Sequence, residues 1–400
     1  MTQDKNDLDI ASLVVHAGER GSVPEGQPVS TPIYASATFT YDSMQEIDQV
    51  FAGEKSDFIY TRYGNPTTAA LQTAVREIEG GATACAYASG MAALHAALYC
   101  CDLKPGSTIL ASQDLYGATT NLLLTIFGSF EVKPVFTDFN DLAQLREQAF
   151  ELRPQALLAE TISNPLLKVC DIEACAEIAH SVNARLIVDN TFASPYLCRP
   201  LAFGANLVVH SATKYLSGHA DAMGGVVISH DELDTASLVG VMKLVGGVLS
   251  VWEAHQILRG LKTLAIRVER QCENARLVAE RLRHNRRVAR VYYPGSTGET
   301  REVTQRMLRE PYAGALVSIE LAKNSRQAAF NFMNALRLCV RSTSLGDVFT
   351  SVLHPATSSH RDLAPAHRSQ LGISDGLVRI SVGIENANDI LDDLEHALRS

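Results

Sequence analysis

The sequence predicts an α/β protein with a mostly parallel central sheet flanked by helices, followed by a smaller α+β domain. Between residues 61 and 255, short apolar runs rich in β-branched residues alternate with amphipathic stretches, which is typical of βα units. After them comes one long amphipathic pattern, and then a mixture of strand-like and helical segments. The chain has 400 residues, more than one hydrophobic core normally accommodates. We therefore expect three parts: an N-terminal arm (1–60), a large domain (61–255) and a C-terminal domain (256–400).

The elements follow in order along the chain. The first 60 residues are rich in turn formers and are not expected to fold alone. Apolar positions three and four apart predict helices over 67–79 and 171–182. In the same region we expect strands at 107–111, 132–136, 156–159, 186–188 and 207–209. The pattern over 254–285 predicts a single hinge helix. Beyond it we expect strands at 289–293, 316–321 and 377–382, with helices over 326–338 and 387–398.

The charge balance argues against several kinds of partner. The chain carries 35 Lys and Arg against 44 Asp and Glu, a net charge of -9, and no basic cluster offsets it. Nucleic acid and anionic membranes are therefore not expected to bind. The longest apolar run, 238–252, is interrupted by Lys243 and is too short to span a bilayer, so we expect it to be buried in the protein. The N-terminus does not resemble a secretory signal, which predicts a cytoplasmic protein.

Cysteine spacing and the common nucleotide motifs exclude further site classes. The eight cysteines form neither a CxxC pair nor a zinc-like cluster, so we expect reduced thiols and no metal site. GxGxxG, GxxxxGK, GxSxG and HExxH are all absent. Ser211-Ala-Thr-Lys214 does match the SxxK pattern of serine acyl-enzymes, although the accompanying SDN and KTG motifs are missing. That enzyme class remains a distant alternative, as does a non-catalytic assembly protein.

Polar residues follow two neighbouring predicted strands. Asp189 ends one strand, and Ser211, Thr213 and Lys214 follow the next. Because ligands collect at the carboxyl ends of parallel strands, these side chains should meet at one edge of the sheet. A lysine that can form an imine, a carboxylate for a pyridinium nitrogen and hydroxyls for a phosphate together suit pyridoxal phosphate (PLP). Taken singly, each residue also fits an ordinary structural role; their order and spacing favour the cofactor.

A second phosphate-binding feature precedes these residues. Ser89, Gly90 and Met91 follow an apolar stretch and open a helical pattern. The free backbone N–H groups and the positive dipole at the start of a helix suit a phosphate dianion. An ordinary serine cap is the alternative interpretation.

Motifs along nearly the whole chain resemble the Cys/Met-metabolism PLP-dependent enzymes, which have the aspartate-aminotransferase fold (fold type I). The motifs in this sequence are Val15-His-Ala-Gly18, Tyr60-Thr-Arg62-Tyr-Gly-Asn-Pro66, Ser89-Gly-Met91, Leu115-Tyr-Gly117, Glu160-Thr-Ile-Ser-Asn-Pro165, Val188-Asp-Asn190, His210-Ser-Ala-Thr-Lys-Tyr215, Ser344-Leu-Gly346 and Val378-Arg-Ile-Ser-Val-Gly-Ile-Glu385.

The resemblance implies a role for each cofactor-site residue. Lys214 would be the Schiff-base lysine, and Asp189 would pair with the pyridine nitrogen. Tyr116 would stack on the ring and carry protons. The phosphate would be held by Ser89, Gly90, Met91, Ser211 and Thr213.

Two more groups of residues follow from the resemblance. Arg379 would bind the substrate carboxylate, helped by Asn164 and Ser344; its place in an apolar strand already suggests burial, where a guanidinium needs a partner. Tyr60 and Arg62 would reach the phosphate of a neighbouring subunit. The N-terminal arm should therefore contact that subunit in a homo-oligomer, commonly a tetramer built as a dimer of dimers.

The resemblance also implies γ-elimination from a sulfur amino acid, giving an α-keto acid, ammonia and a thiol. Asn121 and Phe349 stand where cystathionine enzymes of the family usually carry Arg and Glu, which favours a short apolar γ-substituent and a methionine γ-lyase. Ala118 stands where that branch usually has Cys, and Asn121 resembles the homoserine-ester sulfhydrylases. Cystathionine γ-lyase, cystathionine γ-synthase and O-acylhomoserine sulfhydrylase therefore remain alternatives.

Overall fold

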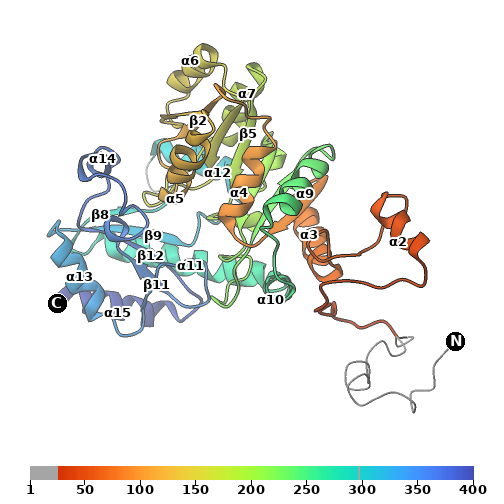
Figure 1. Ribbon diagram of the computed structural model, residues 1–400. Coiled ribbons are helices and arrows are strands. Elements are labelled where there is room, and N and C mark those ends of the chain that lie inside the picture. Colours follow the sequence, from red (N-terminus) through yellow and green to blue (C-terminus); the bar gives the residue numbers. More distant parts are fainter. Residues whose placement is uncertain (1–25, 296–297) are drawn as a thin grey trace. The chain divides into compact units, whose positions relative to one another are not determined.

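The computed structural model describes residues 26–295 and 298–400, without the side chains of residues 298–300. The chain divides into two units, Met1–Pro32 and Ile33–Ser400. The first 25 residues, including the Val15–Gly18 motif and much of the predicted arm, lie outside the described part. The second unit contains two sheets and the elements that cover them (Figure 1). The boundary predicted at residues 255 and 256 stays a prediction.

The larger sheet is mostly parallel, which confirms the predicted fold class. Its seven strands lie in the order β1-β7-β6-β5-β4-β2-β3. Strands β2 to β6 pair in parallel, whereas β7 is antiparallel to both β1 and β6. Their bounds are β1 Thr83–Tyr87, β2 Thr108–Ser112, β3 Lys133–Thr137, β4 Ala156–Glu160, β5 Arg185–Asp189, β6 Leu207–Ser211 and β7 Gly225–Ser229.

Helices cover both faces of this sheet, because its central strands are apolar on both sides and nearly every residue of β4 to β7 is buried. One hydrophobic cluster includes residues of α3, α7 and α10, and a second includes residues of α4, α9 and η2. The helices of this region are α2 Met44–Phe51, α3 Pro66–Glu79, α4 Gly90–Tyr99, α5 Gly117–Asn121, the π-helix η2 Leu122–Phe127, α6 Leu142–Leu152, α7 Ile172–Ser181, α8 Ser194–Leu197, η3 Pro200–Phe203, α9 Asp234–Val245 and α10 Val251–Leu261.

The second sheet has five strands in the order β10-β11-β12-β9-β8. Residues of α11, α13 and α15 pack with β9 and β12 in one hydrophobic cluster, and Figure 1 shows α13 and α15 beside this sheet. The bounds are α11 Leu264–Arg283, β8 Val288–Tyr292, α12 Gly298–Met307, β9 Leu316–Leu321, α13 Arg326–Ala335, β10 Val340–Arg341, β11 Ser351–Leu353, η4 Pro355–Thr357, α14 Pro365–Gln370, β12 Leu377–Ser381 and α15 Ala387–Arg399.

Two predictions about residues 238–285 are wrong. The single helix expected over 254–285 is two helices, α10 and α11, separated at Lys262 and Thr263. The apolar periodicity continues across the break, so the pattern did not reveal it. Within the apolar run 238–252, Leu238 is fully buried, but Leu244, Val245 and Trp252 are 85%, 67% and 60% exposed in the single chain. The expectation that this whole run is buried is therefore wrong for the isolated chain.

Across the described residues, no helix combines the length and the apolarity needed to cross a membrane. The cytoplasmic location stays a prediction.

Candidate active site

One cavity collects most of the predicted site residues. It lies at the carboxyl ends of β4, β5 and β6 and has about 1350 Å³ of empty space, including its open mouth. The predicted residues in its wall are Ser89, Gly90, Met91, Tyr116, Asn164, Asp189, Ser211, Thr213, Lys214 and Arg379. Ser344 is not in the wall but contacts two of these residues, as described below. Tyr60 and Arg62 do not line the cavity.

The start of α4 and the end of β6 form a close-packed cradle. The Ser89 side chain caps α4 by accepting from the Ala92 N–H at 3.2 Å. A Cβ on Gly90 would lie 2.8 Å from the Cβ of Ser211, so a larger residue would push the helix start away from the strand. The Gly90 and Met91 amides at the helix start and the nearby Ser211 hydroxyl suit an anion. The cradle therefore fits the phosphate of PLP.

Asp189 presents a carboxylate to the same cavity. Its Oδ1 accepts a hydrogen bond from the Thr191 N–H at 2.9 Å. Burial raises the pKa of Asp189, while hydrogen bonds from Thr191 act to lower it. A positively charged pyridinium nitrogen beside the carboxylate would favour its ionised form. Asp189 therefore fits the nitrogen end of the cofactor ring.

Lys214 is half-buried in the wall. Its Nζ lies 3.4 Å from the Ser344 Oγ. Burial lowers the pKa of Lys214, and the positive charge of Arg379 lowers it further. A lysine that loses its proton more readily is neutral for more of the time, so more of it is available as a nucleophile or proton acceptor at neutral pH. The Ser211 hydroxyl is not its hydrogen-bond partner, so the geometry gives the SxxK serine enzyme no support.

Arg379 enters the cavity from β12 of the second sheet and is only 2% exposed. Its Nη1 donates to Asn164 Oδ1 at 2.9 Å, and its Nη2 donates to the Ser344 carbonyl oxygen at 3.3 Å. The Nε atom has no partner among the described residues. Burial lowers the pKa of Arg379 to about 10, so the guanidinium is still charged at neutral pH. A buried cation with spare donors suits a carboxylate ligand.

Glu160 is a buried cavity residue that the sequence analysis did not single out. It ends β4, and the register places it beside Asp189 at the end of β5. Its Oε1 accepts from the Tyr116 N–H at 2.6 Å, which fixes the start of α5. Burial raises the pKa of Glu160 well above its usual value, and the nearby Asp189 carboxylate adds to the shift. The strand-end reasoning that selected Asp189 applies equally to Glu160 and could have found it.

Tyr60 and Arg62 lie together away from the cavity wall. The Arg62 guanidinium stacks on the rings of Tyr60 and Tyr63, 5.3 and 4.9 Å from their centroids, and donates to the Lys243 carbonyl oxygen. In the single chain these two residues therefore do not reach the site that the same chain forms.

The two residues used to predict substrate size also lie outside the cavity wall. Asn121 donates to Asp362 at 3.2 Å, and Phe349 is half-buried elsewhere. The wall does include Thr343, Leu353, Ser358 and Ser359. Phe349 therefore does not form part of the cavity wall in the single chain, although Thr343 and Leu345 of the same segment do.

The chain is similar to known proteins over nearly its whole length. Residues 11–399 match the model of the family described as Cys/Met metabolism PLP-dependent enzyme. The chain is 40% identical to L-methionine gamma-lyase of Fusobacterium nucleatum, over 97% of this chain and 98% of that protein. It is 39% identical to cystathionine gamma-synthase of Mycobacterium tuberculosis, over 97% and 96%.

A solved structure shows the same fold. The crystal structure of MetB from Corynebacterium glutamicum superposes with a TM-score of 0.87 at 37% identity, covering 99% of both chains. The motifs, the cavity and these matches lead to one conclusion: the chain belongs to the Cys/Met metabolism PLP-dependent enzyme family and is a PLP-dependent enzyme.

Proposed function

We propose that this enzyme is a carbon–sulfur lyase that carries out γ-elimination on methionine or a closely related sulfur amino acid, releasing an α-keto acid, ammonia and a thiol. The observation that carries the proposal is the buried Arg379–Asn164 pair in the same cavity as Lys214 and Asp189. The L-methionine gamma-lyases among its relatives support the same activity.

PLP, when bound, supplies an electron sink for negative charge that develops on the substrate. The residues of this chain would orient it. Lys214 would anchor its aldehyde carbon, Asp189 would hold the pyridine nitrogen protonated, and the α4 cradle with Ser211 and Thr213 would hold its phosphate. Tyr116 would stack on the ring from the start of α5.

Proton movement falls to two side chains. The Nζ of Lys214, once released, would take the proton from Cα, because burial and Arg379 favour its neutral form. The Tyr116 hydroxyl would serve as the second proton carrier near the departing group. Arg379 and Asn164 would hold the substrate carboxylate so that the Cα–H bond faces Lys214.

The cavity wall favours an uncharged substituent on the substrate. Lys214 and Arg379 are the only Lys or Arg residues in the described wall, and both already have roles. Ile162, Leu353 and Met223 contribute apolar surface. A charged distal group would be desolvated without a partner, which disfavours it against methylthio.

A second candidate keeps the site but exchanges the reaction. The hydroxyls of Ser358, Ser359 and Thr343 in the cavity wall could hydrogen-bond an ester or a polar thiol nucleophile. Replacement at Cγ of an acylated homoserine is therefore the alternative, and the cystathionine gamma-synthases among the relatives support it.

We also propose that the working unit is a homo-oligomer, a tetramer built as a dimer of dimers, in which Tyr60 and Arg62 complete a neighbouring chain's site. Both lie outside the cavity of their own chain. Exposed apolar side chains at Leu244, Val245 and Trp252 would need covering in solution.

The decisive experiment incubates the PLP-loaded enzyme separately with methionine, cystathionine, cysteine and acyl-homoserines, with and without an added thiol. Keto acid, ammonia and thiol from methionine alone would support the lyase. Products that appear only with an acyl-homoserine and a thiol would favour the replacement enzyme. As a matched control, Lys214→Ala should lose both activity and the Lys214-dependent visible absorption; a colourless wild type that takes up no PLP would refute both candidates.

A further inference from the structure

A buried carboxylate that the proposed chemistry does not use lies behind the cavity. Asp347 is 0% exposed, and neither Oδ atom makes a hydrogen bond of ordinary geometry with a described residue. Burying an ionised carboxylate without compensation is unfavourable. Burial accordingly raises the pKa of Asp347, whereas the Ser344 hydroxyl, the charge of Lys214, the Ala220 backbone and the charge of Arg267 act to lower it.

The turn that carries Asp347 packs directly against the segment that carries Lys214. The Val348 N–H donates to the Gly218 carbonyl oxygen at 3.0 Å. Gly346 has φ +77°, and a Cβ there would lie 2.8 Å from the Tyr215 backbone nitrogen, so this close approach requires glycine. From α11, Gln271 Nε2 donates to the Asp347 carbonyl oxygen at 2.7 Å and fixes the turn from the other side.

The charges of Lys214 and Arg267, one from each packed element, act on the Asp347 carboxylate, although neither forms an ion pair with it among the described residues. Ser344 links Lys214 to this carboxylate. Its hydroxyl lies 3.4 Å from the Lys214 Nζ, and the same hydroxyl lowers the pKa of Asp347. Arg267 of α11 is 3% exposed. Its Nη2 donates to the Gly260 carbonyl oxygen at 2.9 Å, and its Nε donates to Thr263 Oγ1 at 3.1 Å.

The charge of Asp347 affects the pKa values of both Arg267 and Lys214. The remaining Arg267 nitrogen, Nη1, is buried without a hydrogen-bond partner, as is the Tyr215 hydroxyl. Burial lowers the pKa of Arg267 to about 10, and Asp347 opposes that shift. For Lys214, burial and Arg379 lower the pKa, and Asp347 raises it. Asp347 is thus the carboxylate that opposes Arg379 at Lys214.

We propose that Asp347 is a positioning residue for Lys214: its buried carboxylate, shared between Arg267 and Lys214, is the counter-charge that lets Nζ hold a proton beside the cation Arg379. The inference rests on the proposed function, in which Nζ must accept a proton and keep it until it is passed on. Without Asp347, two cations would face each other across the cavity when Nζ is protonated. With it, the protonated lysine has a partner charge.

The test follows the protonation of Nζ spectroscopically in the PLP-loaded full chain. The visible absorption changes as Nζ of Lys214 loses its proton, so the midpoint of a pH titration reports the charge environment of that atom. Asp347→Asn removes the charge with little change of shape, and the midpoint should fall by about one pH unit or more. Arg267→Met frees Asp347 to act on Lys214 alone, and the midpoint should rise.

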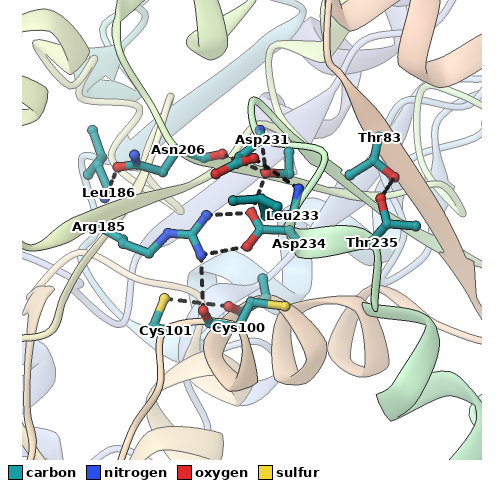
Figure 2. Close-up of polar contacts among 12 residues, drawn as sticks. Thr83, Cys100, Cys101, Arg185, Leu186, Asn206, Asp231, Leu233, Asp234 and Thr235 are labelled. Carbon is teal, nitrogen blue, oxygen red and sulfur yellow. Dashed lines mark hydrogen bonds and ion pairs between the residues drawn. The ribbon is translucent and has the colours of Figure 1, made fainter. Parts of the chain in front are cut away.

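The matched control is another buried carboxylate. Asp234 forms a two-pronged pair with Arg185, at 2.8 and 2.5 Å, and Arg185 also donates to the Cys100 carbonyl oxygen (Figure 2). Asp234→Asn should destabilise the chain but leave the midpoint unchanged.

An unchanged midpoint in Asp347→Asn, or shifts in the same direction for Asp347→Asn and Arg267→Met, would overturn the inference. So would failure of both variants to reach the wild-type circular dichroism spectrum, because the cluster would then serve stability. The proposed function fails separately, if wild type and Lys214→Ala show the same visible spectrum.

Discussion

The role of Arg379 leads to a prediction in which activity and stability change differently. Replacing Arg379 with Met keeps much of its volume and removes the two donors available to a substrate carboxylate. Each hydrogen bond to a charged group is worth about 1.5–3 kcal/mol, so two are worth about 3–6 kcal/mol. Because about 1.4 kcal/mol corresponds to a tenfold rate change, kcat/KM for methionine should fall about a hundred-fold to ten-thousand-fold.

Stability should not follow activity in this variant. The guanidinium is buried, its Nε has no partner, and burial already lowers its pKa to about 10. Replacing a buried cation that has no ion-pair partner removes its desolvation cost, which offsets the loss of its hydrogen bonds to Asn164 and the Ser344 carbonyl oxygen. We therefore expect an unchanged or higher Tm. Arg379→Lys, which keeps the charge but loses the fork, should lose about ten- to a hundred-fold in kcat/KM.

The assay combines keto-acid release with thermal unfolding and the visible absorption of bound PLP. Arg290→Met is the control, since Arg290 is exposed on β8 and stacks on the Tyr292 ring at 4.7 Å; it should leave kcat/KM unchanged. Wild-type kcat/KM in Arg379→Met would refute the assignment. Loss of PLP absorption together with a lower Tm would instead show that Arg379 holds the cavity together, and would also refute it.

Three further predictions test the cofactor cradle, the buried carboxylate and the oligomer. Gly90→Ala should weaken PLP binding at least about tenfold by titration, because its Cβ would lie 2.8 Å from the end of β6, whereas Gly240→Ala on α9, with open space around it, should bind PLP normally. The pKa of Glu160 is raised on folding, so its contribution to stability is present at low pH and is lost as the pH rises above the ordinary pKa of 4.5. Glu160→Gln should therefore have a higher Tm than wild type at pH 8, and the difference in Tm should shrink toward pH 5. A difference in Tm that does not change with pH would contradict this. Mixing Arg62→Ala with Lys214→Ala chains should restore activity that neither shows alone, because one mixed site would carry both wild-type residues; no recovery in verified mixed oligomers would count against a shared site.

A structural feature could be predicted from the sequence only where it left a local pattern. Asp189 and Lys214 were found because apolar strands end just before or at them, and the same rule applies to Glu160. The break between α10 and α11 left no trace, because apolar spacing continues through Lys262 and Thr263. Strands β1 and β7 were missed although each has five residues, as β2 to β6 do; they pair antiparallel with each other, and β7 lies outside the regular alternation of strand and helix.

Long-range placement was harder to predict than local structure. Arg379 could be assigned only by resemblance, since its contact with Asn164 joins residues 215 positions apart. Phe349 was assigned to the cavity by resemblance, from its place three residues after the Ser344–Gly346 motif, and it does not line the cavity of the single chain. The role proposed for Asp347, in the same segment, could not be predicted from the sequence, because it depends on the burial of Asp347 and on the charge of the buried Arg267.

The strand order of the smaller sheet determines when, during synthesis, the chain can complete its proposed substrate-binding site. Strand β12 is the last strand to leave the ribosome, yet it occupies the middle of the sheet, between β11 and β9. Until it inserts, β10 and β11 cannot join β9 and β8, so this sheet must form late and through contacts distant in sequence. A chain stalled before residue 377 would already contain Lys214, Asp189 and the whole α4 cradle, but not Arg379. Such a fragment would carry the groups proposed to hold the cofactor, but not the arginine proposed to bind the substrate carboxylate.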